Sequence, residues 1–200
     1  MMPRAFCFDL DGTITTTEIL PCVASELGIA DEIATLTRAT MDGHIDFESS
    51  FRLRCVVLGQ VSPDQVNAIV SGVPLNEAIL SFIQDHRENS FIVTGNLDIW
   101  IRTIADRCGC EAFSSQGTYE GSQLRLKKIL NKADAVATLR ARGFDEIVAV
   151  GDGANDAPML AAADIAIAYG GVHPPAASAR AAAHYIIHEG ETLCRLLTAL

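Results

Sequence analysis

The sequence lacks any apolar run of about 18 residues, the length that a helix needs to cross a membrane. Its longest apolar stretch, residues 159–171, is interrupted by Asp164. The start of the chain reaches Asp9 before an apolar segment of about 7 residues can form, so we expect no secretory signal peptide. These absences favour a cytoplasmic protein without a membrane partner.

Basic residues are also scarce. Lys and Arg number 15 against 25 Asp and Glu, which gives a formal net charge of -10 at pH 7. Binding to nucleic acid or to an anionic membrane depends on positive charge that displaces counterions. We therefore expect neither as a partner, although a local basic pocket for a small anionic substrate remains compatible with this charge. The composition does not predict an oligomeric state.

The six cysteines show no spacing typical of a disulfide framework or of a zinc site. Cys108 and Cys110 are separated by one glycine and have no His or Cys nearby at zinc spacing, so we interpret them as small buried side chains. A chain of 200 residues that is 49% hydrophobic can bury a sizeable core without disulfides. A reducing compartment such as the cytosol suits this pattern.

Short apolar runs alternate with helical patterns along much of the chain. Buried strands are predicted at residues 5–10, 91–94, 111–113, 147–150, 165–168 and 185–187, with a hairpin or loop over 116–126. Helical patterns at residues 76–85, 99–107, 132–142, 158–163 and 176–183 lie between or beside them. This alternation predicts an α/β fold with a doubly wound, mainly parallel, Rossmann-like sheet.

The segment between the first two predicted strands is helical throughout. Helices are expected over residues 20–27, 31–41, 46–58 and 63–70, each followed by a glycine that ends it. Four helices are too many for a plain crossover between neighbouring strands. We interpret residues 16–73 as an inserted helical-bundle cap domain, and residues 1–15 with 74–200 as the α/β core domain.

Carboxylates collect where the predicted strands end. Asp9 and Asp11 follow the first strand, and Asp152 and Asp156 follow a later one. The carboxyl ends of parallel strands meet at one crevice, where ligands bind. Four carboxylates packed there repel one another and favour a bound cation, and Mg²⁺ suits oxygen ligands beside a phosphate. Each Asp-Gly dipeptide alone is also an ordinary turn, so the prediction rests on the combination.

Groups suited to phosphate accompany these carboxylates. Thr94 and Gly95 offer a hydroxyl and a closely approachable backbone N–H at the end of the second strand. Lys132 follows Asn131, a good N-cap, so its charge opposes the helix dipole unless an anion lies nearby. Taken singly, Lys132 could be an ordinary solvated lysine on the surface, and Asn155 or Asp156 could simply cap a helix. Together they favour a phosphate ligand.

The order and spacing of four segments resemble the four motifs of the haloacid dehalogenase superfamily of phosphohydrolases. These segments are Asp9-Leu-Asp-Gly-Thr13, Thr94, Lys132 and Gly151-Asp-Gly-Ala-Asn-Asp156. The resemblance implies Mg²⁺-dependent hydrolysis of a phosphomonoester, with Asp9 as the nucleophile and Asp11 as the general acid and base. It implies metal ligation by Asp9, the Asp11 carbonyl and Asp152 with support from Asp156, and phosphate binding by Thr94, Gly95, Lys132 and Asn155.

The predicted cap resembles that of the phosphoserine phosphatases within this superfamily. The resemblance implies that Glu18 binds the substrate ammonium, that Arg54 binds its carboxylate, and that Met41 and Phe47 shield the site. Other interpretations remain open at these positions. Thr15-Thr-Thr-Glu18 is also a capping-box pattern, Arg54 could lie on the surface, and the two apolar residues could pack within the cap.

One departure leaves the substrate open. The segment Thr94-Gly95-Asn96 stands where phosphoserine phosphatases usually have Ser-Gly-Gly. The cap resemblance favours phosphoserine as the substrate. This departure leaves phosphohomoserine or a sugar phosphate open as alternative substrates, and phosphoryl transfer open as an alternative reaction. A phospho-receiver domain gathers similar residues around Mg²⁺, but it lacks the Asp-x-Asp pair on the first strand and the long helical insertion.

Overall fold

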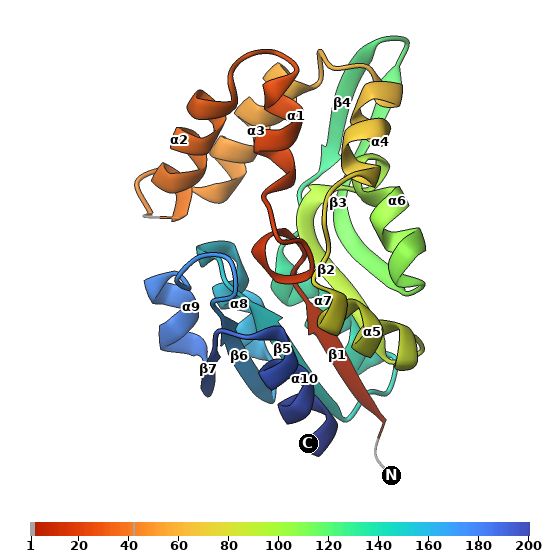
Figure 1. Ribbon diagram of the computed structural model, residues 1–200, viewed down its shortest axis with the longest axis vertical. Helices are drawn as coiled ribbons and strands as arrows, with labels where there is room; N and C mark the ends of the chain where they lie inside the picture. The colour runs from red at the N-terminus through yellow and green to blue at the C-terminus, as the bar shows by residue number, and fades with distance from the viewer. Residues whose placement is uncertain (1–2, 42) are drawn as a thin grey trace.

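The computed structural model describes residues 3–41 and 43–200, without the side chain of Met41. Within these residues a sheet with the strand order β4-β3-β2-β1-β5-β6-β7 is covered by helices (Figure 1). The strands are β1 (Arg4–Phe8), β2 (Ser90–Leu97), β3 (Glu111–Glu120), β4 (Gln123–Lys128), β5 (Glu146–Gly151), β6 (Ile165–Tyr169) and β7 (Tyr185–Ile187). Neighbouring strands pair in parallel except β3 and β4. The predicted doubly wound fold is confirmed.

The predicted helices are present with small shifts at their ends. Between β1 and β2 lie α1 (Ile19–Ser25), α2 (Ala30–Met41), α3 (Phe47–Leu58) and α4 (Pro63–Ser71). The remaining helices described are α5 (Glu77–Asp85), α6 (Asp98–Cys108), α7 (Lys132–Ala141), α8 (Ala157–Ala162), α9 (Ala177–Ala182) and α10 (Gly190–Ala199). Side-chain caps explain several starts: Asp46 accepts from the backbone N–H of Ser49, and Ser62 forms a capping box.

Alternate residues of the strands enter two separate hydrophobic clusters. Phe6 and Phe8 of β1 join the cluster that contains residues of α5, α6 and α10, whereas Ala5 and Cys7 join the cluster of α7, α8 and α9. Both faces of β1 are therefore covered by helices. This two-sided burial is why the strand reads as a continuous apolar run rather than as an alternating pattern.

Helices α1–α4 continue one of these clusters beyond the sheet. Ile19, Phe51 and Val70 belong to the same hydrophobic cluster as Phe8. Figure 1 shows α1, α2 and α3 at the end of the sheet opposite both chain termini, while α4 packs against α6. The division into a core and a cap domain stays a prediction. Across the described ranges, no helix is both long and apolar enough to cross a membrane.

The strand register brings the predicted site residues to one edge of the sheet. Phe8 of β1 pairs with Ile92 of β2 and with Val150 of β5. Consequently the residues that follow these three positions emerge together at the carboxyl ends of adjacent strands. β2 runs three residues past the predicted end at Thr94, to Leu97, because it continues to pair with β3 after a register shift. The undecided segment 116–126 is an antiparallel hairpin of β3 and β4.

Candidate active site

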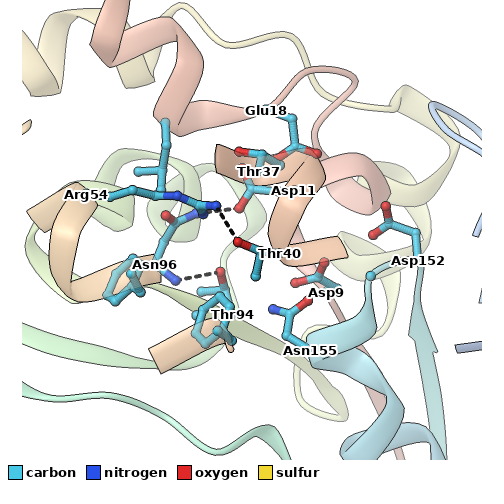
Figure 2. Close-up of a pocket in the computed structure, with 15 residues that line it drawn as sticks. Asp9, Asp11, Glu18, Thr37, Thr40, Arg54, Thr94, Asn96, Asp152 and Asn155 are labelled. Carbon is cyan, nitrogen blue, oxygen red and sulfur yellow. Dashed lines mark hydrogen bonds between the residues drawn. The ribbon is translucent and has the colours of Figure 1, made fainter. Parts of the chain in front are cut away.

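A pocket lies at this edge, between the strand ends and helices α2 and α3 (Figure 2). It encloses about 610 Å³, counting its open mouth. Most of the predicted site residues line it, namely Asp9, Asp11, Glu18, Phe47, Arg54, Thr94, Gly95, Asp152 and Asn155. In Figure 2, Asp9, Asp152 and Asn155 lie on one side and Arg54 and Asn96 on the other, with Asp11 between them.

Lys132 and Asp156 are buried behind Asp9 rather than in the pocket wall. The Nζ of Lys132 lies 2.5 Å from Oδ1 of Asp9 and 2.5 Å from Oδ1 of Asp156. Burial alone would lower the pKa of Lys132, but the two carboxylates hold it above its ordinary value. The anion expected beside this helix-terminal lysine is therefore supplied by the protein itself. Its contact with a substrate phosphate stays a prediction.

Asp9 follows β1 and is 4% exposed. Burial and the neighbouring Asp156 carboxylate raise the pKa of Asp9 to about 7, against the opposing charge of Lys132. The turn that follows is tight: Gly12 has a φ of +73°, and a Cβ there would lie 2.8 Å from Oδ2 of Asp152. Only glycine fits this conformation and this contact, which places Asp152 beside the first strand end.

Asp11 lies in the same turn and is held by two donors. Its Oδ1 accepts the backbone N–H of Ile19 at 2.8 Å, and its Oδ2 accepts from the side-chain amide of Asn96. Burial and the nearby Glu18 carboxylate raise the pKa of Asp11 to about 7. A carboxyl group that titrates near neutral pH can both give and take a proton, as general acid–base chemistry requires.

Three carboxylates form a cluster that fits a divalent cation. One carboxylate oxygen from each of Asp9, Asp152 and Asp156 lies within 4.8 Å of the corresponding oxygens of the other two residues. Asp156 is already bonded by Lys132 and by the backbone N–H groups of Asp152 and Gly153. Among the described residues, no hydrogen-bond donor reaches the Asp152 carboxylate, which is only 3% exposed. Burial, Asp9 and Asp156 raise the pKa of Asp152 well above its usual range.

This donor set matches the predicted metal site in part. One lysine balances only one of three buried carboxylates, so the excess negative charge suits a hard divalent ion with oxygen ligands. The side chain of Asp11 is not part of the cluster because it faces Ile19 and Asn96. The sequence-based prediction assigned its backbone carbonyl instead, and that assignment stays a prediction.

Glu18 faces the pocket and does not cap the helix that it precedes. It occupies the N-cap position of α1 without a side-chain capping hydrogen bond, so the capping-box interpretation is wrong. The first N–H of α1 bonds to Asp11 instead. Burial and Asp9 raise the pKa of Glu18 to about 7, although Arg54 opposes this. Nε2 of His173, which the sequence did not single out, lies 4.0 Å from Glu18.

Arg54 is buried, so the alternative of a surface position is also wrong. It is 6% exposed, and its Nη2 donates to the hydroxyl of Thr40 at 3.3 Å. Its Nε has no hydrogen-bond partner among the described residues. Burial lowers the pKa of Arg54 and Glu18 counteracts the effect. A buried guanidinium with an unused N–H is prepared for an additional acceptor.

The remaining wall is formed by residues of α2 and α3 and by the end of β2. The ring of Phe47 stacks on Phe51 and covers Gly95. Thr37, Thr40 and Asn96 also line the pocket, although the sequence analysis gave none of them a role. The predicted residue Met41 ends α2, but its side chain lies outside the described part of the structure.

A family model of haloacid dehalogenase-like hydrolases matches residues 3–164. The chain belongs to this family. This haloacid dehalogenase-like hydrolase is 27% identical to a phosphoserine phosphatase from Methanocaldococcus jannaschii over 179 residues, which cover 83% of the chain and 85% of the relative. It is 29% identical to a phosphoserine phosphatase from Halobacterium salinarum over 185 residues, which cover 84% of each.

A solved structure has the same fold as this haloacid dehalogenase-like hydrolase. It is described as a phospho-aspartyl intermediate analogue of phosphoserine phosphatase, and it superposes with a TM-score of 0.85. The match covers 100% of both chains at 23% sequence identity. The family predicted from the four motifs is thus confirmed, together with the fold that it implies.

Proposed function

We propose that this protein hydrolyses a phosphomonoester through a phosphate carried on Asp9, and that its preferred substrate is L-phosphoserine. The observation that carries the substrate is that Glu18 and Arg54 both line the pocket that contains Asp9 and Asp11. The guanidinium of Arg54 in the pocket wall suits a carboxylate, and Glu18 suits an ammonium. The relatives named phosphoserine phosphatase support the same substrate.

The first step transfers the phosphoryl group to Asp9. A carboxylate oxygen of Asp9 attacks phosphorus, and the bond from phosphorus to the substrate oxygen breaks. Protonated Asp11 gives its proton to that leaving oxygen, so serine departs as the neutral alcohol. The raised pKa of Asp11, about 7, provides this protonated form near neutral pH.

The second step regenerates the enzyme. Ionised Asp11 takes a proton from a water molecule as the water oxygen attacks phosphorus, and the bond from phosphorus to Asp9 breaks. Inorganic phosphate leaves, Asp9 is again a carboxylate and Asp11 again carries a proton. Thr94 and Gly95 bind phosphate oxygens through a hydroxyl and a backbone N–H, and Lys132 holds the Asp9 carboxylate in place.

The metal of this proposal is Mg²⁺. Asp9, Asp152 and the Asp11 carbonyl would hold it, with Asp156 in support. When bound, the ion supplies positive charge to the oxygens of the transferring phosphoryl group. The cysteines of the described residues are free thiols, which supports a cytoplasmic location as part of the proposal.

The test is phosphate release from the purified protein with and without Mg²⁺. The substrates are L-phosphoserine, phosphothreonine, phosphohomoserine, a sugar phosphate and an aryl phosphate, with Asp9→Asn as the inactive control. We expect strong preference for L-phosphoserine and dependence on both Mg²⁺ and Asp9. Preference for another ester would contradict L-phosphoserine as the substrate but leave the proposed reaction unchanged. Absence of activity on all esters would contradict the proposed hydrolysis.

A phospho-receiver domain accounts less well for the site. Such a domain needs the acidic residues, a hydroxyl and a lysine, which are all present. It does not need Glu18 and Arg54 in the wall of a pocket next to Asp9. Repeated turnover of a free phosphate ester separates the two, because a receiver hydrolyses only its own phosphate.

A further inference from the structure

Asn96 connects the proposed phosphate-binding segment with the proposed acid–base residue. It lies two residues after Thr94 on β2 and is 4% exposed. Its backbone N–H donates to the hydroxyl of Thr94 at 3.1 Å, and its side-chain Nδ2 donates to Oδ2 of Asp11 (Figure 2). The contact joins residues that are 85 positions apart in the chain.

The two donors to Asp11 divide the carboxylate between them. The N–H of Ile19 at the start of α1 reaches Oδ1, and the amide of Asn96 reaches Oδ2. One hydrogen bond at each oxygen fixes both the position and the plane of a carboxylate. With Ile19 alone, the group could rotate about its side-chain bonds and Oδ2 would face the pocket without a protein donor.

The chemistry of the amide suits this role. An ionised carboxylate only accepts hydrogen bonds, so the NH₂ group of Asn96 must face it. A neutral amide adds no charge beside Asp11. An aspartate of the same shape would replace the donor with a second carboxylate, and a smaller residue would leave space for water.

We propose that Asn96 is a positioning residue that holds the Asp11 carboxylate toward the phosphate site, so that Asp11 protonates the leaving oxygen. The inference rests on the proposed hydrolysis and concerns how its first step is aligned. Asn96 lies on the same strand end as Thr94 and Gly95. One short segment thus holds both the bound phosphate and the proton donor. A small misalignment between these two groups would lower the reaction rate strongly.

The test compares two aryl esters of similar shape in the full-length protein. Phenyl phosphate releases a basic phenolate that needs a proton, whereas p-nitrophenyl phosphate releases a weakly basic one that does not. The ratio of their kcat/KM values reports proton donation in the first step, since kcat/KM excludes the later attack of water. Neither ester carries the amino and carboxylate groups that Glu18 and Arg54 are proposed to bind.

We expect Asn96→Ala to lower kcat/KM for phenyl phosphate by about 10- to 100-fold, a part of the 10²- to 10⁴-fold that a positioned general acid typically contributes. The loss for p-nitrophenyl phosphate should stay within about 3-fold, because its leaving group needs little protonation. Asn96→Asp, which keeps the shape and removes the donor, should be at least as impaired. In an Asp11→Asn background, Asn96→Ala should change the single-turnover rate by less than about 2-fold, since the group that it positions is gone.

Asn76→Ala is the matched control outside the site. Asn76 caps α5 and donates to the Tyr169 hydroxyl, so its loss lowers stability without touching the pocket. The ester ratio of this variant should equal that of the wild type. Equal losses on both esters for Asn96→Ala, or a change confined to the KM for L-phosphoserine, would overturn the inference. Inactivity of the wild type on every ester would instead contradict the proposed function on which it rests.

Discussion

The aromatic ring of Phe47 on α3 lies against the backbone of Gly95 at the end of β2. A Cβ on Gly95 would stand 2.3 Å from Cζ of that ring, a separation that packed carbon atoms do not reach. The helical insertion therefore contacts the strand end at the point where a phosphate is proposed to bind. This close approach requires a glycine at position 95 on β2, and it leaves room for the large ring of Phe47 on α3.

Gly95→Ala should separate α3 from the strand end. Overpacking of this kind typically costs about 1–3 kcal/mol, and the opened wall should lower kcat/KM by about 10-fold or more. Thermal unfolding and steady-state kinetics measure both effects. Gly72→Ala is the matched control, because a Cβ there meets only ordinary contacts beginning at 3.4 Å. Restoration of activity in Gly95→Ala by Phe47→Leu would support the cause, and a fully active Gly95→Ala enzyme would contradict it.

Arg54→Lys tests recognition of the substrate carboxylate. Lysine keeps the charge and loses the planar fork, so we expect KM for L-phosphoserine to rise about 10-fold or more. An aryl phosphate should react within about 3-fold of the wild-type rate, since it has no carboxylate to lose. Arg52→Lys, at the exposed end of an ion pair with Glu48, is the control. Equal loss on both substrates would assign Arg54 to the chemistry instead.

Asp152→Asn should stabilise the metal-free protein and abolish its response to Mg²⁺. The buried carboxylate lacks a hydrogen-bond donor in the described structure and is repelled by Asp9 and Asp156. Replacing it with a neutral amide removes this repulsion and should raise the free energy of unfolding. The wild type should gain about 2.7 kcal/mol at a Mg²⁺ concentration of 100 times Kd. Unfolding by urea with and without Mg²⁺ measures both. The exposed Asp85→Asn should behave as the wild type, and undiminished Mg²⁺ stabilisation of Asp152→Asn would place the ion elsewhere.

Asp164 should contribute to stability at neutral pH and lose that contribution in acid. Burial tends to raise its pKa, but hydrogen bonds from Arg140 and from the N–H of Ile147 hold the pKa below its ordinary value. A folded-state pKa below the unfolded one gives stability that is present above the unfolded pKa and is lost as pH falls through the folded one.

Asp164→Ala should accordingly cost about 1 kcal/mol at pH 7 and less at an acidic pH below the folded-state pKa, where the wild-type carboxyl has taken up its proton as well. The cost is small because the ion pair of Arg140 and Asp164 is about 40% exposed and screened by solvent. Urea unfolding at the two pH values measures the difference. An equal cost at both would trace the loss to packing instead of charge.

The sequence predicted the sheet and the carboxylate site because both depend on local patterns. Apolar runs followed by Asp9 and by Asp152 indicate buried strands that end in polar groups, and parallel pairing then brings those ends together. The contact of Asn96 with Asp11 had no such signal, since it joins side chains that are 85 positions apart in the chain. Thr37 and Thr40 were missed because hydroxyls on a helix face look the same whether they face water or a pocket.

The hydrophobic cluster that joins Ile19, Phe51 and Val70 to Phe8 has a consequence for engineering. Residues 16–73 contribute side chains to the same apolar cluster as the sheet, so exchanging them between family members would also disturb the packing of the sheet. A chimera would have to carry over the side chains on the facing strand and on α6 as well. Changes in substrate preference are therefore easier to reach by single replacements around the pocket than by transplanting the whole helical segment.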